Sequence, residues 1–183
     1  WCDTRFTWDK DKLDAGQILS PAAIAERAKE LVPQHSLRCG LHVVITGGEP
    51  MLHQHQLPEL IDALTTAGFV FFEIETNGTF APSRMLIDRI SWWNCSPKLS
   101  NNGLTQVENL NSEALKTIAS TCRADFKFVI RSQNDIEELL AIYLPLLPRD
   151  RIMLMPEGSL PGAQAAAMPL VLAACQEYGF RFS

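Results

Sequence analysis

Short apolar runs, rich in aromatic and β-branched residues, recur along the chain and alternate with longer amphipathic segments. An uninterrupted apolar run is typical of a strand that is buried on both faces, as in a parallel sheet. The runs therefore predict strands at residues 41–46, 69–75, 91–96, 125–130 and 151–156, with a sixth beginning at Gly179.

The segments between these runs have the signals of helices. Ser20 predicts an N-cap and Pro21 suits the first helical position of a helix over residues 20–32. The spacing of Ile24, Ala28, Leu31 and Val32 predicts its apolar face.

Four further helices are expected over residues 57–68, 111–120, 132–144 and 162–179. Gly68 is the expected stop of the first of them, because glycine adopts the left-handed conformation that ends many helices. Asn111 or Ser112, and Ser132 or Asn134, are the expected caps of the next two. We expect Pro169 to kink or delay the last helix, since proline lacks the amide hydrogen.

This regular alternation of strands and helices predicts an α/β fold with right-handed crossovers. Closed or partly closed barrels and open doubly wound sheets both satisfy the pattern. In either architecture ligands bind at the carboxyl ends of the strands. Candidate chemistry is therefore sought where each run ends.

Composition narrows the class of protein. A chain of 183 residues is long enough for one domain with a sizeable core and too short for two. The net charge of −5 gives no electrostatic reason to expect a nucleic-acid partner. No apolar run reaches the roughly 20 residues of a membrane span, and no signal-peptide pattern opens the chain. Because the chain does not begin with Met, we expect its native start to be missing or processed.

The five cysteines are scattered at Cys2, Cys39, Cys95, Cys122 and Cys175. An odd, dispersed set argues against a secreted disulfide scaffold and predicts a reducing, cytoplasmic location. No C-x-x-C pair is present, so no complete zinc or iron–sulfur motif is visible. Cys39 and Cys175 lie in apolar or alanine-rich surroundings, which predicts packing residues or inert thiols.

The first strand ends in TGGEP. Gly47 and Gly48 allow a backbone to approach a ligand closely, and Pro50 restricts the exit of the loop. Glu49 can accept a hydrogen bond from an ammonium group or from a backbone amide. The combination suits an amino-acid-like ligand, although an ordinary turn between a strand and a helix has the same composition.

Two other strand ends have polar candidates. After the third strand, Ser96, Pro97 and Lys98 would bring a hydroxyl and a cation to the site, or Lys98 is a solvated surface side chain. After the second, Glu75 could bind a ligand or accept from neighbouring loop amides, and Gly78 predicts a positive φ.

Histidines give a weaker signal. His35 and His42 are isolated in the sequence, whereas His53 and His55 form an H-x-H pair without a third ligand at a suggestive spacing. The pattern favours a solvated loop or helix entry over a metal site.

Taken in order, WCDTRFTW, VVITGGEP, IETNGT and SPKLS resemble the 7-carboxy-7-deazaguanine synthase family of radical S-adenosylmethionine enzymes. TGGEP alone is shared by many radical S-adenosylmethionine families, whereas WCDTxxTW together with SPK is far more specific. The resemblance covers nearly the whole chain. It implies a single core domain over residues 1–183, built as a partial (β/α) barrel that lacks its N-terminal start and its C-terminal tail.

The resemblance also implies the reaction. Members of the family use a [4Fe–4S] cluster, S-adenosylmethionine and Mg²⁺ to convert 6-carboxy-5,6,7,8-tetrahydropterin to 7-carboxy-7-deazaguanine and ammonia. A 5′-deoxyadenosyl radical takes hydrogen from carbon 6 of the pterin in that family. The implied partners are an electron donor such as flavodoxin and a second subunit in a homodimer.

Site residues follow from the same resemblance. Cys2 matches the third cluster ligand and Thr4 the threonine that contacts Mg²⁺, a hard oxygen ligand for a hard ion. Thr46 matches a residue that contacts the pterin. The residues implied to contact S-adenosylmethionine are Trp1, Cys2, Asp3, Gly48, Ser96, Pro97 and Lys98. MPEG, at residues 155–158, corresponds more loosely to a further cofactor-contacting loop.

The chain departs from the family pattern at both of its ends. The first two cluster cysteines of the family lie upstream of the W-C-D-T segment and have no counterpart here, and Cys39, Cys95 and Cys122 fit strand, helix and loop positions instead. We therefore expect a fragment that is inactive alone. The alternatives are another radical S-adenosylmethionine enzyme, such as a glycyl-radical activase, which CDT and SPK disfavour, and a non-catalytic fragment that binds S-adenosylmethionine or dimerises.

Overall fold

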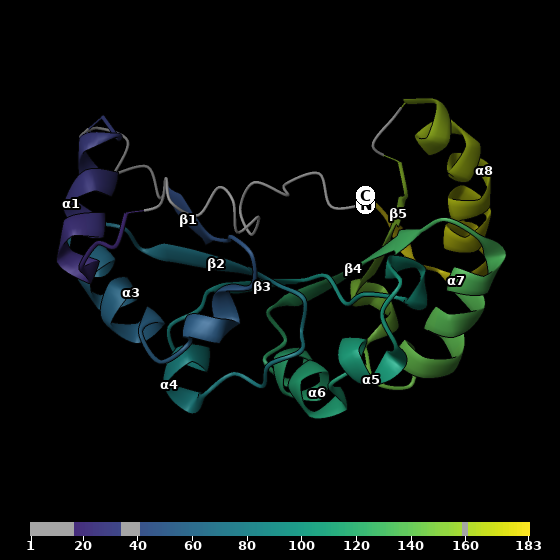
Figure 1. Cartoon of the computed structure of the whole chain (residues 1–183), viewed down its shortest axis with the longest axis horizontal. Coiled ribbons are helices and arrows are strands. Elements are labelled where there is room, and N and C mark those ends of the chain that lie inside the picture. Colours follow the sequence, from purple (N-terminus) through teal and green to yellow (C-terminus); the bar gives the residue numbers. More distant parts are fainter. Residues whose placement is uncertain (1–16, 34–40, 159–160) are drawn as a thin grey trace. The chain divides into compact units, whose positions relative to one another are not determined.

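The computed structural model describes residues 17–33, 41–158 and 161–183. Six strands form one sheet in the order of the sequence (Figure 1). They are β1 (His42–Ile45), β2 (Phe71–Thr76), β3 (Trp92–Cys95), β4 (Ala124–Ile130), β5 (Ile152–Pro156) and β6 (Arg181–Phe182). All six apolar runs are thus confirmed as strands.

Neighbouring strands run parallel, with Val44 opposite Glu73 and Phe126 opposite Ile152 as examples of the register. A doubly wound sheet reverses its strand order at a switch point, whereas these strands follow one another without reversal. The α/β fold is confirmed, and the strand order is that of a partial barrel.

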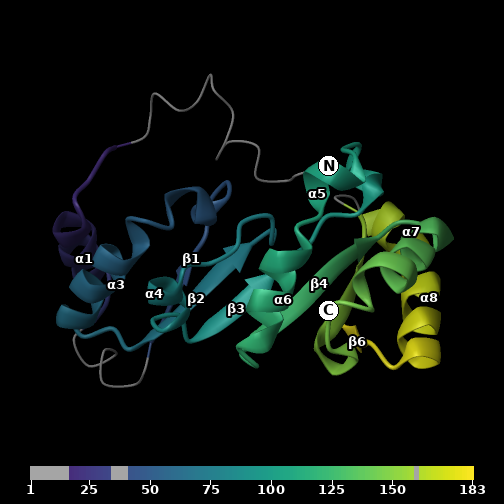
Figure 2. The same ribbon diagram turned by 90° about the horizontal axis from the view of Figure 1, so that it is seen from below.

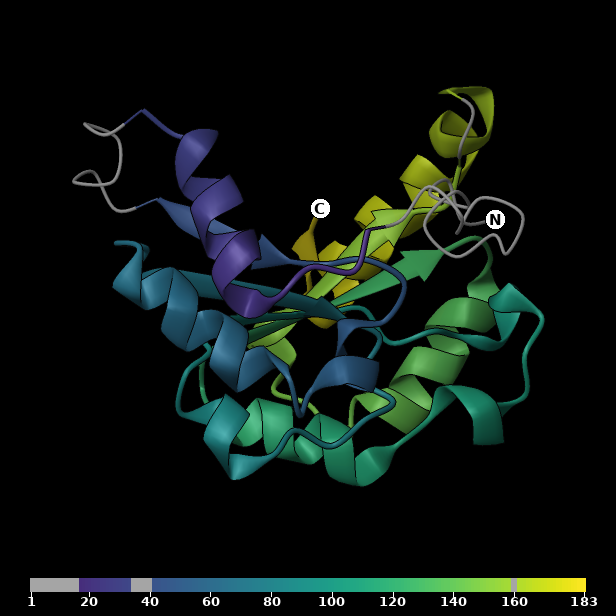
Figure 3. The same ribbon diagram turned by 60° about the vertical axis from the view of Figure 1, so that its left-hand side comes forward.

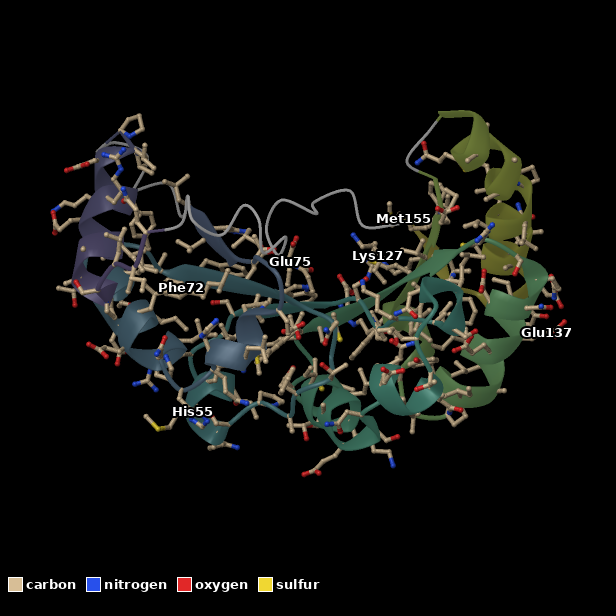
Figure 4. All side chains as sticks on the ribbon, viewed as in Figure 1. His55, Phe72, Glu75, Lys127, Glu137 and Met155 are labelled. Carbon is tan, nitrogen blue, oxygen red and sulfur yellow. The ribbon has the colours of Figure 1, made fainter. Side chains whose placement is uncertain are left out.

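The expectation that the strands are buried on both faces is wrong. Along β4, Phe126 and Phe128 are fully buried, whereas Lys127 and Val129 between them are only half-buried. Figures 1 and 4 show α6 and α7 on one side of β4 and the labelled Lys127 on the opposite side. Side chains alternate between the faces of a strand, and here helices cover one face, so only every second residue is buried.

The chain divides into two compact units. The first comprises the described residues up to Glu75 together with residues 82–92, and the second comprises residues 76–81 and the described residues from Trp93 onwards. The prediction that residues 1–183 form a single core domain stays a prediction.

Besides its strands, the first unit contains α1 (Pro21–Glu30), the 3₁₀ turn η3 (Pro50–His53), α3 (Leu57–Thr66) and the short α4 (Arg84–Ile87). Helices α1 and α3 lie side by side (Figures 1 and 3). The Ser20 hydroxyl caps α1 by accepting from the Ala23 amide at 3.2 Å, which confirms the expected cap. The expected apolar face is partly wrong, because Leu31 follows the last helical residue and is 72% exposed.

The second unit holds the largest buried side chains, among them Trp93, Phe126 and Tyr143. Its helices are η4 (Ser100–Asn102), α5 (Gln106–Asn109), α6 (Ser112–Ser120), α7 (Gln133–Glu138), the π-helical turn η5 (Leu139–Tyr143), η6 (Arg149–Arg151) and α8 (Pro161–Tyr178). Helix α8 lies beside β5 and β6 (Figures 1 and 2).

Most helix boundaries in both units were foreseen. Gly68 has a φ of 104° just after α3, Asn111 caps α6, and Ser132 caps α7. Pro169 lies inside α8 and does not delay its start. None of the described helices is both long and apolar enough to cross a membrane.

Candidate functional site

The loop after β1 is exposed at its start and anchored at its end. Thr46, Gly47 and Gly48 are exposed, whereas Pro50 is buried. Glu49 accepts from the Met51 amide at 3.0 Å and caps the first turn of η3. Gly47 has a φ of +149°, a conformation that side-chain-bearing residues rarely adopt. The loop therefore presents its exposed backbone from a fixed base, as TGGEP predicted.

Glu75, at the end of β2, bonds to the loop after β1. Its Oε2 accepts from the Thr46 hydroxyl at 2.8 Å, and both side chains are exposed. Figure 4 shows Glu75 on the side of β2 opposite α4. Glu75 thus accepts a hydrogen bond from a side chain of its own unit. The sequence had suggested a ligand or neighbouring loop amides as its donors.

The strand end after β3 joins a cation, a hydroxyl and a carbonyl in one chain of hydrogen bonds. Lys98 Nζ donates to Ser96 Oγ at 3.2 Å, and that hydroxyl donates to the Lys127 carbonyl at 3.1 Å. Pro97 between them is buried, and Ser96 and Lys98 are half-buried. Lys98 is therefore not a fully solvated side chain, because it is half-buried and bonded to Ser96, and its role in ligand binding stays a prediction.

The loop after β2 packs against that same strand end. Gly78 has the expected positive φ, +77°, and a Cβ there would lie 2.8 Å from Cys95 Sγ and 2.7 Å from Leu115 Cδ2. Asn77 Oδ1 accepts from both the amide and the hydroxyl of Thr79. Glycine is required here by the backbone conformation and also by the close packing.

A cavity of about 330 Å³ lies where β4 and β5 end. Its polar lining comes from Arg131 and Glu157, and the rest comes from the start of α8 through Ala163, Ala166, Ala167 and Leu170. Glu157 belongs to the MPEG loop, and its amide donates to the Ile130 carbonyl at 2.8 Å. The sequence reading did not single out Arg131 or Lys127. The sequence pattern that could have identified them is a cationic residue within an apolar run or directly after one.

The described histidines, His42, His53 and His55, do not form a metal-binding group. His42 pairs with Glu73 at 2.7 Å and stacks on Phe71, so it is isolated only in the sequence. His55 lines a different hollow of about 350 Å³, on the side of α3 and α4 (Figure 4). Within the described residues no group of three or more His, Cys, Asp or Glu side chains could hold a metal ion.

Arg89 and Asp62 line the same hollow as His55. The Arg89 guanidinium donates to both Asp62 oxygens, at 2.9 and 3.0 Å. These hydrogen bonds lower the pKa of Asp62 and raise that of Arg89.

Curated proteins similar to this chain share one name. A 7-carboxy-7-deazaguanine synthase of Pyrobaculum aerophilum is 33% identical over 99% of this chain and 75% of its own length. The chain belongs to the 7-carboxy-7-deazaguanine synthase family. The Hyperthermus butylicus synthase is 33% identical over 85% of this chain, and the Escherichia coli synthase 31% over 81%. The chain spans 62% and 66% of these two relatives. No protein-family model matches the chain.

Four predicted site residues lie outside the described residues: the cluster ligand Cys2, the Mg²⁺ contact Thr4, and Trp1 and Asp3, which were expected to contact S-adenosylmethionine. His35 and Cys39 lie outside them as well. Among the described cysteines, Cys95 is buried in β3, Cys122 is exposed after α6, and Cys175 is buried in α8. Burial raises the pKa of the Cys175 thiol, as suits an inert packing residue.

Each unit has hydrogen-bonding groups at a strand end. The exposed Gly47–Gly48 backbone offers amides and carbonyls in the first unit, and the Lys98 ammonium offers donors in the second.

Proposed function

We propose that the protein containing this chain converts 6-carboxy-5,6,7,8-tetrahydropterin to 7-carboxy-7-deazaguanine and ammonia. The reaction is that of a carbon–nitrogen lyase in 7-deazapurine, and hence queuosine, biosynthesis. The observation that carries this proposal is the 33% identity to a named synthase across 99% of the chain. The polar strand ends support it, because they lie where an α/β barrel binds its ligands.

In the first unit, we assign the exposed Thr46 hydroxyl to the pterin. The Glu75 carboxylate accepts the hydrogen bond of this hydroxyl, which leaves the lone pairs of Thr46 Oγ1 to accept from a donor on the substrate. We assign the Gly48 backbone to the methionine end of S-adenosylmethionine. The Glu49 cap on η3 keeps that backbone in place.

In the second unit, we assign Ser96, Pro97 and Lys98 to S-adenosylmethionine. The Lys98 ammonium, drawn to Ser96, would donate to a carboxylate or a ribose hydroxyl. Buried Pro97 removes one backbone donor and restricts the loop, so the two polar side chains keep their spacing.

Toward the N-terminus, we assign Cys2 to the [4Fe–4S] cluster, Trp1 and Asp3 to S-adenosylmethionine, and Thr4 to Mg²⁺. When bound, the cluster and S-adenosylmethionine supply the one-electron chemistry that removes a hydrogen atom from the pterin. We further propose a flavodoxin-type electron donor and a homodimer as the functional assembly.

An anaerobic assay tests this function. The protein containing the chain, expressed in full, is reconstituted with iron and sulfide and incubated with S-adenosylmethionine, Mg²⁺, dithionite and the carboxytetrahydropterin. Mass spectrometry should detect 7-carboxy-7-deazaguanine. A protein that carries the cluster and binds S-adenosylmethionine without forming product would refute the synthase assignment and favour a binding role.

A lysine variant and its control test whether Lys98 contributes to the cofactor site. Lys98→Met should raise the KM for S-adenosylmethionine by about tenfold, the effect of losing one charge-assisted hydrogen bond. Lys116→Met, on α6, is the matched control and should leave the KM unchanged. Equal KM values for both variants would remove Lys98 from the cofactor site.

A further inference from the structure

The loop that follows β3 is held on both sides of one buried leucine. Leu99 is 1% exposed. The Lys98 carbonyl before it accepts from the Tyr143 hydroxyl at 2.8 Å. The Ser100 amide after it donates to the Glu138 carboxylate at 3.0 and 3.1 Å, and the Ser100 hydroxyl donates to the same group at 2.6 Å. Two side chains of one helical segment thus fix the two peptide groups that flank Leu99.

A π-helical turn brings these two side chains to the same loop. Helix α7 ends at Glu138 and continues as η5, in which the Leu144 amide donates to the Leu139 carbonyl at 2.9 Å, five residues back. In an α-helix, residues five apart point about 140° away from each other. A turn closed by hydrogen bonds between residues i and i+5 is wider and reduces that angle, so Glu138 and Tyr143 can contact one target.

The phenol is fixed as a hydrogen-bond donor. Tyr143 is fully buried and packs edge-to-face on Phe128 of β4, with ring centroids 5.0 Å apart. Burial, followed by the nearby Glu138 carboxylate, raises the pKa of Tyr143 to about 12. A tyrosine keeps its proton at neutral pH even at its ordinary pKa of 10.0, and the raised pKa extends the donor role of this hydroxyl to alkaline pH.

A third contact ties the loop to the sheet. Asn101 Nδ2 donates to the Val129 carbonyl on β4 at 3.0 Å. Together with the hydrogen bond from Ser96 to the Lys127 carbonyl, it fixes both ends of the loop to one strand. The backbone of residues 96–101 is therefore shaped before any ligand arrives.

We propose that Tyr143 and Glu138 are positioning residues, which hold residues 96–100 in the form that lets Ser96 and Lys98 bind S-adenosylmethionine. The inference rests on the proposed function, because it takes that cofactor as the ligand of Ser96 and Lys98. Neither residue touches the ligand. Both act through the backbone, and the π-turn is the feature that makes their joint action possible.

Hydrogen exchange and ligand affinity test this proposal in the reconstituted protein. Glu138→Ala should raise the exchange rate of amides 98–102 by about tenfold without ligand, and weaken S-adenosylmethionine binding roughly fivefold. Tyr143→Phe removes one oxygen and should weaken binding by a smaller factor. Glu138→Gln retains an acceptor oxygen and should restore much of the affinity.

Each variant has a matched control. Glu137→Ala removes an exposed carboxylate one residue away, on the outer side of α7 (Figure 4). Tyr178→Phe makes the same change in the other tyrosine of the chain, on α8. Both controls should leave the exchange of amides 98–102 and the dissociation constant at wild-type values.

The two proposals fail in different ways. Wild-type protein that does not bind S-adenosylmethionine would refute the ligand assignment and with it the cofactor part of this inference. Wild-type protein that binds, together with Glu138→Ala and Tyr143→Phe variants that keep wild-type affinity and exchange, would refute the positioning role and leave the function standing.

Discussion

The loops after β1 and after β3 occupy equivalent places at the ends of their strands, yet they are held in different ways. The first, residues 46–50, has exposed residues at its start and is anchored by the Glu49 cap at its end. The second, residues 96–100, contains buried Pro97 and Leu99. Its backbone accepts a hydrogen bond from Tyr143 and donates one to Glu138. The first is supported by its own Glu49 and by one exposed hydrogen bond to Glu75 of the neighbouring strand, and the second by a buried helical segment far along the chain.

This difference separates two ways of making a binding loop. A loop supported locally can tolerate changes elsewhere, and its exposed residues are free to respond to a ligand. A loop built into the core is preorganised, so its polar groups need not be ordered when the ligand binds. Substitutions near the second loop should therefore cost folding stability, whereas substitutions in the first should mainly alter function.

The largest expected effect is that of Gly78→Ala, beside the strand end that starts the second loop. The new Cβ would lie 2.7 Å from Leu115 Cδ2 and 2.8 Å from Cys95 Sγ, at a φ of +77°. Backbone strain and overpacking together should lower the free energy of unfolding by about 3 kcal/mol. Urea denaturation measures the change.

Gly47→Ala is its counterpart in the first loop. Gly47 also has a positive φ, but a Cβ there would meet no atom within 4 Å. Only backbone strain remains, and we expect a loss of about 1 kcal/mol. Equal losses for the two variants would contradict the contrast between a packed and an exposed loop.

Asp135→Ala should have the next largest effect. Asp135 is buried, and one of its oxygens accepts from the Arg131 and Ser132 amides, both at 2.7 Å. Its removal leaves two backbone donors unpaired at the start of α7 and should cost about 2 kcal/mol by urea denaturation. Asp150→Ala, at an exposed position, is the control and should change stability by less than about 0.5 kcal/mol.

Thr46→Val tests the functional half of the comparison. The exposed hydrogen bond to Glu75 should contribute less than about 1 kcal/mol to stability. If Thr46 contacts the pterin, the KM for that substrate should rise several-fold in the steady-state assay. Thr66→Val, at another exposed threonine, on α3, serves as the control. A large loss of stability with an unchanged KM would reverse the role that we assign to the first loop.

The smallest effect concerns an exposed ion pair in the unit of the first loop. Hydrogen bonds from Arg89 lower the pKa of Asp62 below its ordinary value of 3.8 in the folded state. A carboxyl group whose pKa is lowered by folding stabilises the folded state at pH values above its ordinary pKa. That contribution is lost as the pH falls through the lowered, folded-state pKa. Asp62→Asn should therefore be slightly less stable than wild type at pH 7, with the difference shrinking toward pH 3. A difference that grows on acidification would contradict the pairing.

Much of the fold was predictable because its signals are local. Apolar runs gave the strands, and Ser20, Asn111 and Ser132 gave helix caps within a turn of their partners. The half-exposed face of the sheet was not foreseen, although Lys127 within an apolar run was a sign of it. The exposure of Leu31 was also missed, because spacing shows which residues share a face but not what covers it.

The position of Ser96 and Lys98 at a strand end was predictable from the sequence, whereas the support of their loop was not. Ser96 and Lys98 follow a strand end, which is a pattern that sequence reveals. Glu138 and Tyr143 lie about forty residues further on and reach the loop through a π-turn. That turn breaks the 3.6-residue period on which helix patterns depend, so the pairing of these side chains with the loop has no local signal.

The central claim is that this chain belongs to an enzyme that removes hydrogen from carbon 6 of a carboxytetrahydropterin by way of S-adenosylmethionine. The most direct measurement uses substrate that carries deuterium at carbon 6, with mass spectrometry of the 5′-deoxyadenosine formed by the reconstituted protein. The account predicts deuterium in the 5′-deoxyadenosine together with formation of 7-carboxy-7-deazaguanine. Product formed without any transfer of deuterium, or 5′-deoxyadenosine formed without product, would contradict it.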